Sequence, residues 1–211
     1  MCSNDSTKTE PQPEYASFEN AAEFHGHVCP GLSSGYQVAI AAMKALGVTR
    51  PKDEELVAIA ETDACGVDAI QVVTGCTAGK GNLIVHDYGK HVFTFYCRES
   101  GKAVRAMTCL EEFMPQKPEM DVLRPKVFSG TATEEEQTTF YAMVNQVSKA
   151  ILEAPSEKVV KLEFVQMEPP KKARIFTSIP CGCCGEMVAD AKTREHEGKQ
   201  ICMPCFLKLK E

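Results

Sequence analysis

Four cysteines near the end of the chain have the spacing of a zinc site. Cys181 and Cys184 form one Cys-x-x-Cys pair, Cys202 and Cys205 form a second, and seventeen residues separate the pairs. A tight turn brings thiolates i and i+3 to the same side of an ion, and two such turns complete a tetrahedron. A site with four protein ligands has no open coordination position, so this spacing predicts a structural zinc finger.

The alternative for the same cysteines is a pair of disulfides. The first thirty residues contain no apolar stretch of the kind found in signal peptides or membrane spans. This predicts a cytoplasmic protein with no membrane association, whose thiols stay reduced and available for zinc. Cys183 lies inside the first pair and can replace one of its ligands, although Cys184 gives both pairs the same register.

A second group of metal-binding side chains lies near the start of the chain. His25, His27 and Cys29 alternate with other residues. In an extended run residues i, i+2 and i+4 project to one side, so these three side chains can converge on one ion. Imidazole and thiolate suit zinc, iron, nickel or copper. Alternatively, the histidines bond to loop backbone and Cys29 is a small core residue.

Two further cysteines and one carboxylate are candidates for the same site. Asp63 has the position of an N-cap before a predicted helix over 64–74, which places Cys65 in its first turn. The positive end of the helix dipole would lower the pKa of that thiol, so Cys65 is our leading nucleophile or metal ligand. Asp68 lies one turn further on the same edge and is the candidate base. Cys76 follows the helix as a further possible ligand.

Cations near these residues suggest an anionic ligand. Gly79 and Gly81 flank Lys80, and such a loop can present backbone N–H groups and one cation to an anion. It lacks the pattern of a Walker P-loop, and glycines that serve only the turn, with a solvated lysine, are the alternative. Arg105 and Lys90 are further candidate partners of an anion.

The elements that must position these residues indicate an α+β fold. Apolar periodicity predicts a buried helix over 31–46, and a capping box at Thr133 predicts a long helix after it. The apolar stripe from Phe140 to Ile151 on that helix is interpreted as core or subunit contact. Runs rich in apolar and β-branched residues predict a mixed or antiparallel sheet packed with helices. The predicted strands cover residues 56–61, 83–87, 91–97, 103–108 and 159–167.

Length and charge bound the domain organisation. The chain has 211 residues and a net charge of -6, enough for one core and an appendage. We expect a flexible tail over 1–17, a core domain over 18–170 and the zinc finger over 171–211. Residues 171–211 carry eight Lys/Arg and five Asp/Glu, a balance of +3, which leaves -9 for the rest. Neither part has the dense basic patch that nucleic-acid binding requires.

Most of the chain resembles FmdE, a family named as a subunit of formylmethanofuran dehydrogenase. The similar strings are Phe24-His-Gly-His-Val-Cys-Pro-Gly31, Asp63-Ala-Cys-Gly-Val-Asp-Ala-Ile-Gln71, Thr74-Gly-Cys-Thr-Ala-Gly-Lys-Gly-Asn-Leu83, Asp87-Tyr-Gly-Lys90, Gly101-Lys-Ala-Val-Arg105 and Pro170-Lys-Lys-Ala-Arg-Ile175, together with the terminal cysteines. The resemblance implies an α+β core with a pocket around the His-x-His-x-Cys segment, a small zinc finger, and dimers. The family name implies C1 chemistry with a molybdenum or tungsten enzyme.

Three functions follow as hypotheses. The first is a metal-binding accessory or subunit of a C1 oxidoreductase, with a second transition metal (zinc, nickel or iron) in the core beside the zinc of the finger. The second is a free-standing thiol or metallo-enzyme acting on a small anionic substrate through Cys65 and Asp68, with Lys80 and Arg105 as anion partners. The third is a regulator or scaffold that binds its partner through the finger.

Overall fold

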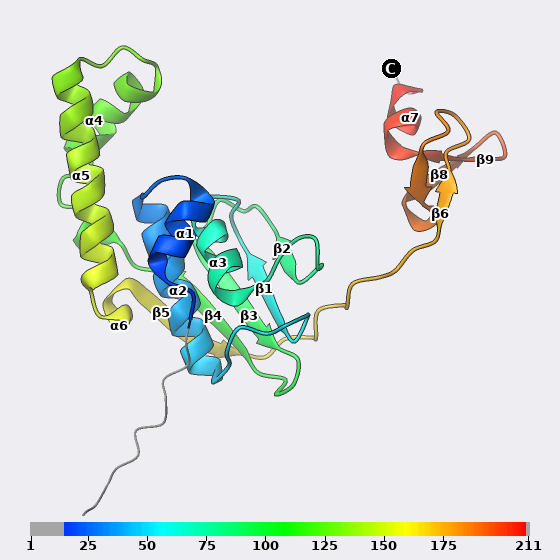
Figure 1. The fold of residues 1–211 in the computed structure, drawn as a ribbon, viewed down its shortest axis with the longest axis horizontal. Coiled ribbons are helices and arrows are strands. Elements are labelled where there is room, and N and C mark those ends of the chain that lie inside the picture. The colour runs from blue at the N-terminus through cyan, green and yellow to red at the C-terminus, as the bar shows by residue number, and fades with distance from the viewer. Residues whose placement is uncertain (1–14, 210–211) are drawn as a thin grey trace, which may run out of the picture. The chain divides into compact units, whose positions relative to one another are not determined.

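The structure is a computed structural model that describes residues 15–209, and it divides between Lys172 and Ala173 into two compact units (Figure 1). Most of the tail expected over 1–17 lies outside the described residues. Its last three residues contact the first unit, where the Tyr15 hydroxyl donates to the Val48 carbonyl at 3.3 Å. The ordered core therefore includes residues that precede position 18.

The first unit is built on a five-stranded mixed sheet in the order β2-β1-β3-β4-β5. This confirms the predicted fold class. The β1–β2 pair is parallel and the other pairs are antiparallel. The strands are β1 (Leu56–Ala60), β2 (Leu83–Val85), β3 (Val92–Cys97), β4 (Ala103–Thr108) and β5 (Val160–Val165). We expected β2 to precede β3 in an antiparallel meander, but it pairs with β1 after a helical crossover, as parallel strands require.

Helices cover one face of this sheet (Figure 1). Helices α2 (Pro30–Leu46) and α3 (Gly66–Thr74) pack against the sheet, and α1 (Phe18–His25) packs on α2 and α3. Successive strand side chains point to opposite faces, so Phe93 and Phe95 of β3 both pack in the same buried cluster as Val38 of α2 and Ile70 of α3. The helix expected over 31–46 is therefore confirmed as a buried one.

Cysteines are the N-cap residues of both α2 and α3, and the N-cap of α3 differs from the sequence prediction. Cys29 is the N-cap of α2, and its sulfur accepts the Leu32 N–H at 3.4 Å. The N-cap of α3 is Cys65 and not Asp63, and no side chain caps this helix. The Thr62 hydroxyl accepts the Ala64 N–H in the turn that precedes the helix. Cys65 consequently lies at the helix boundary and not inside the first turn.

The backbones of α2 and α3 nearly touch where they cross. A Cβ atom on Gly35 would lie 2.5 Å from the Cα and the carbonyl oxygen of Gly66. Only a residue without a side chain fits at this distance. The crossing lies close to the start of both helices, so it brings the Cys29 and Cys65 ends together.

A helical hairpin completes the first unit. Helix α5 (Glu134–Glu153) begins at the predicted capping box, in which Thr133 accepts the Glu136 N–H and the Glu136 carboxylate accepts the Thr133 N–H. Helix α4 (Lys117–Phe128) was not among the elements predicted from the sequence. Pro118 lies in the first turn of α4, where its missing N–H is no loss. The remaining short elements of this unit are η1 (Glu111–Phe113) and α6 (Ser156–Val159).

The second unit consists of two short hairpins and a helix. Its elements are β6 (Ser178–Pro180), β7 (Met187–Ala189), η2 (Asp190–Lys192), β8 (Thr193–His196), β9 (Lys199–Cys202) and α7 (Met203–Lys208). Its small core contains Cys181, Ile201 and Cys202. Within residues 15–209 no helix combines the length and apolar character needed to cross a bilayer.

Candidate metal centre

His25, His27 and Cys29 converge in the first unit. One ligand atom from each lies within 4.8 Å of the other two. The convergence does not come from an extended run, as we had argued, because His25 is the last residue of α1. Gly26 then adopts a left-handed conformation (φ 90°) and reverses the chain, and Cys29 begins α2. A helix end, a turn and a helix start thus supply one ligand atom each.

A carboxylate orients the first of these histidines. His25 Nδ1 lies 2.7 Å from an Asp68 carboxylate oxygen, and the other carboxylate oxygen accepts the Gln71 side-chain amide at 3.1 Å. With Nδ1 donating to Asp68, the lone pair of His25 is on Nε2, which lies 3.9 Å from the Cys29 sulfur. Carboxylates bonded to the far nitrogen of an imidazole are the usual partners of metal-binding histidines. We had considered Asp68 as a base, and the structure places it where it orients His25.

The two thiols at the helix starts lie side by side. A Cβ atom on Gly31 would be 3.9 Å from both the Cys29 and the Cys65 sulfur. Burial raises the pKa of the Cys29 thiol to about 11, although the Leu32 N–H opposes the shift and nearby Cys65 adds to it. Cys29 is therefore a neutral thiol at neutral pH, and an ion that binds it must displace its proton.

The structure does not bring Cys76 or Lys80 to this group. Cys76 is fully buried, and its thiol donates to the Leu56 carbonyl at 3.4 Å. Cys65 and Cys76 flank opposite ends of α3, whose nine residues extend roughly 14 Å. Lys80 lies in the turn that follows Cys76, where its N–H donates to the Thr77 hydroxyl.

Arg105 and Lys90 have a different partner from the expected anion. Both approach the carboxylate of Glu61, Arg105 at 3.2 Å and Lys90 at 3.9 Å. Arg105 points from β4 to the sheet face opposite Val104, which packs beneath the helices. These two cations thus form an ion-pair cluster on the sheet and are not among the residues that line the cavity described next.

A cavity of about 950 Å³ opens beside the His25–His27–Cys29 group. One end of its lining is formed by His27, Cys29 and Cys65, and another side by Phe140 and Val144 of α5. Part of the stripe that we interpreted as core or subunit contact therefore forms a cavity wall. His91 and Arg124 also line the cavity and were not among our candidates. No local pattern marks them, because they come from separate elements that meet only in the folded chain.

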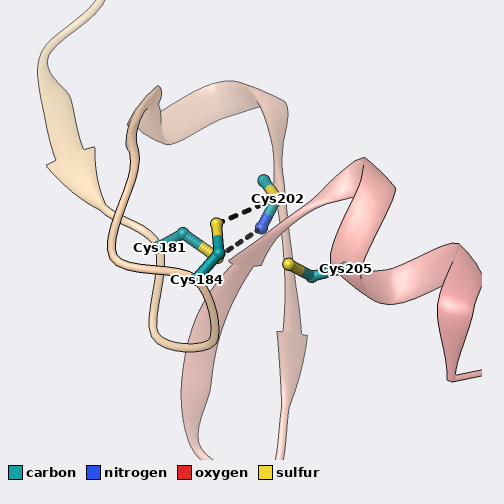
Figure 2. A group of neighbouring side chains, drawn as sticks. All are labelled: Cys181, Cys184, Cys202 and Cys205. Atoms are coloured by element: carbon teal, nitrogen blue, oxygen red, sulfur yellow. Dashed lines mark hydrogen bonds between the residues drawn. The ribbon is translucent and has the colours of Figure 1, made fainter.

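The second unit holds the four cysteines of the predicted finger, as Figure 2 shows. Their sulfur atoms all lie within 4.8 Å of one another, and the Cys184 and Cys202 sulfurs are 3.9 Å apart. The Cys181 sulfur accepts the Cys202 N–H at 3.2 Å and the Cys183 N–H at 3.4 Å. These backbone bonds, with that of Cys202 the strongest, lower the pKa of Cys181 to about 6 and so favour the thiolate that zinc binds.

All cysteines in the described part of the chain are free thiols. Cys183 and Cys184 are both exposed, but only Cys184 belongs to the group of four, which makes it the better candidate ligand in the first pair. Four thiolates fit zinc, whereas two imidazoles and a thiolate fit zinc, iron or nickel better than the hard cations magnesium and calcium.

Known proteins similar to this chain include one curated relative and one solved structure. A curated relative, named a probable S-adenosyl-L-methionine-binding protein of Archaeoglobus fulgidus, is 32% identical over 191 residues. That match covers 88% of the chain and 51% of the relative, so the chain spans about half the length of the curated relative it matches. The crystal structure of a tungsten formylmethanofuran dehydrogenase FmdE-like protein from Syntrophus aciditrophicus has the same fold. Its TM-score is 0.59 at 23% identity, over 93% of this chain and 97% of that one.

The family comparison covers the region that holds the histidines, the helix-start cysteines and strands β1 to β4. Residues 24–161 match the family described as "FmdE, Molybdenum formylmethanofuran dehydrogenase operon". The resemblance drawn from the sequence is thereby confirmed. This chain belongs to the FmdE family.

Proposed function

We propose that this protein is a metal-binding FmdE subunit or accessory protein with two metal sites of different kinds. In the core, His25, His27 and Cys29 hold a transition metal, with Cys65 beside them as a further ligand or reactive thiol. In the second unit, the four finger cysteines hold a structural zinc ion. The observation that carries the proposal is the Asp68 carboxylate 2.7 Å from His25 Nδ1, because it leaves Nε2 free to bind an ion.

The two sites differ in what they can do chemically. Four thiolates complete the tetrahedral coordination of zinc, so the finger contributes folding free energy and no chemistry. The core group supplies three protein ligands, and two of its members, His27 and Cys29, also line the cavity. A metal with three protein ligands keeps a position for an exogenous ligand, which is the arrangement of catalytic sites.

The family name supports the wider role. FmdE proteins are named after the operon of a molybdenum formylmethanofuran dehydrogenase. We propose a cytoplasmic protein that works with other subunits of a C1 oxidoreductase, which would supply the pterin and iron–sulfur chemistry. The homodimer implied by the resemblance is part of the same proposal, and light scattering on the purified protein tests it.

A free-standing enzyme is the second candidate. The adjacency of Cys65 to Cys29 at the cavity supports it, since a thiol at a helix start beside a cavity suits nucleophilic chemistry. Turnover by the purified protein in the absence of other subunits would favour this candidate. The finger-based regulator has no comparable observation in its favour.

Metal analysis tests the proposal directly. We expect two metal ions per chain in the wild type and one after Cys29→Ser, with the finger zinc retained. Asp68→Asn should weaken core metal binding about 10- to 100-fold, because the imidazole loses its orienting carboxylate. Asp121→Asn is the matched control, since that carboxylate pairs with Lys117 on the surface of α4. A single metal in the wild type that persists in Cys29→Ser would refute the core site.

A further inference from the structure

We propose that the cavity beside the core metal group binds a small organic anion with an apolar body, such as an acyl or aromatic carboxylate. The anionic group would lie at the end formed by Cys29 and Cys65, and the apolar body along α5. The inference deepens the proposed function, because it names the ligand class of the same site.

The apolar walls of the cavity indicate that its ligand has an apolar body. Phe140 and Val144 of α5, Met120 and Phe128 of α4, and Leu110 present apolar side chains to it. Its volume of about 950 Å³ lies at the upper end of the range for small-molecule sites. Phe128 is 74% exposed and Tyr141, another wall residue, is 51% exposed. Large aromatic side chains left this accessible around a cavity are typical of a ligand site.

The charged side chains around the cavity indicate that its ligand carries a negative charge. The protein carries 29 Asp and Glu residues and a net charge of -6. Among the described residues, however, none that lines the cavity is Asp or Glu, whereas His27, His91 and Arg124 are present. Arg124 also pairs with Asp121 at 3.3 Å on the surface of α4, where both side chains are partly exposed. A cavity with basic groups and no acidic ones, in an acidic protein, selects anions.

The helix starts locate the anionic group. The N-termini of α2 and α3 converge where Gly31 approaches both the Cys29 and the Cys65 sulfur, and Gly31, Ser34 and Ala64 also line the cavity. Helix α3 begins without a side-chain cap. The Leu32, Val67 and Asp68 N–H groups already have partners, so the contribution of the helix starts is that of two dipoles whose positive ends favour a carboxylate in this part of the cavity.

S-adenosyl-L-methionine, in the name of the Archaeoglobus fulgidus relative, has the opposite charge character. It combines a sulfonium and an ammonium with one carboxylate, for a net positive charge. The cavity lining offers no described carboxylate to either cationic group. The charge argument thus predicts that this cavity prefers an apolar carboxylate to S-adenosyl-L-methionine.

The test is calorimetric titration of the full-length, zinc-loaded protein with four probes. These are octanoate, octylamine with the same apolar body and opposite charge, butanoate with a shorter body, and S-adenosyl-L-methionine. We expect octanoate to bind at least tenfold more tightly than octylamine. Each buried methylene is worth up to about fourfold in affinity, so octanoate should also bind at least tenfold more tightly than butanoate. Equal or tighter binding of octylamine, of butanoate, or of S-adenosyl-L-methionine would overturn the inference.

A pair of variants locates the binding event. Asn145 of α5 lines the cavity and is exposed, so Asn145→Asp adds a carboxylate there without disturbing the core. It should weaken octanoate binding about tenfold by charge repulsion. Gln146→Glu makes the same change on the next residue, which is exposed and is not among the lining residues, and should leave affinity unchanged. Equal effects of the two variants would overturn the inference.

Metal counting in the same samples separates this inference from the proposed function. Loss of octanoate selectivity with the core metal present would overturn the ligand class and leave the metal site intact. Octanoate selectivity without a core metal would uphold the ligand class and overturn the metal function.

Discussion

The contact between α2 and α3 at Gly35 offers a sharp test of how the fold builds the site. An added Cβ would lie 2.5 Å from two backbone atoms of Gly66, and ordinary contact begins at 3.4 Å. The two helices must therefore separate by about 0.9 Å in Gly35→Ala. Overpacking of this kind costs about 1–3 kcal/mol, against which alanine regains up to about 1 kcal/mol of helix propensity. We expect the variant to be destabilised by about 1–2 kcal/mol.

Thermal unfolding followed by circular dichroism measures this cost. For a chain of this size, 1 kcal/mol shifts the Tm by about 2–4 °C, so Gly35→Ala should lower it by about 2–8 °C. Core metal affinity should fall as well, since the separation moves the Cys29 and Cys65 ends of the helices. Gly79→Ala is the control, because a Cβ there meets no atom within 4 Å and the residue is exposed. An unchanged Tm in Gly35→Ala would refute the argument that the close contact of α2 and α3 brings Cys29 and Cys65 together.

Three further predictions concern individual groups. In metal-free protein, Cys29 should react with iodoacetamide about tenfold more slowly at pH 7.5 than a thiol with the ordinary pKa of 9.0, because burial raises its pKa to about 11 and the greater nucleophilicity of the more basic thiolate offsets part of the smaller thiolate fraction. The rate should keep rising with pH beyond 9, and a plateau near pH 9 would contradict this. Cys202→Ser should abolish the proposed zinc binding of the second unit and make residues 173–209 sensitive to protease while the first unit stays resistant. Limited proteolysis with mass spectrometry distinguishes this from general unfolding. Thr133→Ala should destabilise the first unit by about 1 kcal/mol through loss of the capping box with Glu136, measured by urea unfolding, and Thr133→Ser should restore most of it.

Several features could be predicted from the sequence because they depend on residues that are close together in the chain. The capping box at Thr133 and the finger spacing depend on residues close together in the chain, so their patterns are complete within a few positions. The runs of apolar and β-branched residues in β3 and β4 likewise predict strands from residue type alone. By contrast, α4 was not predicted, and it contains Pro118 near its start and Pro125 in its interior, where proline usually breaks a helix.

The ligand types, the finger spacing and the α+β class follow from the sequence alone, because these depend on residue chemistry and short-range periodicity. Which candidates meet depends on the tertiary structure. Cys65 joins Cys29 because two glycines let α2 and α3 touch, and Asp68 reaches His25 across forty-three positions. Cys76, equally suitable by type, is excluded because the length of α3 carries it to the opposite end of the helix. Distances across the chain depend on how the elements pack, and no local pattern encodes them.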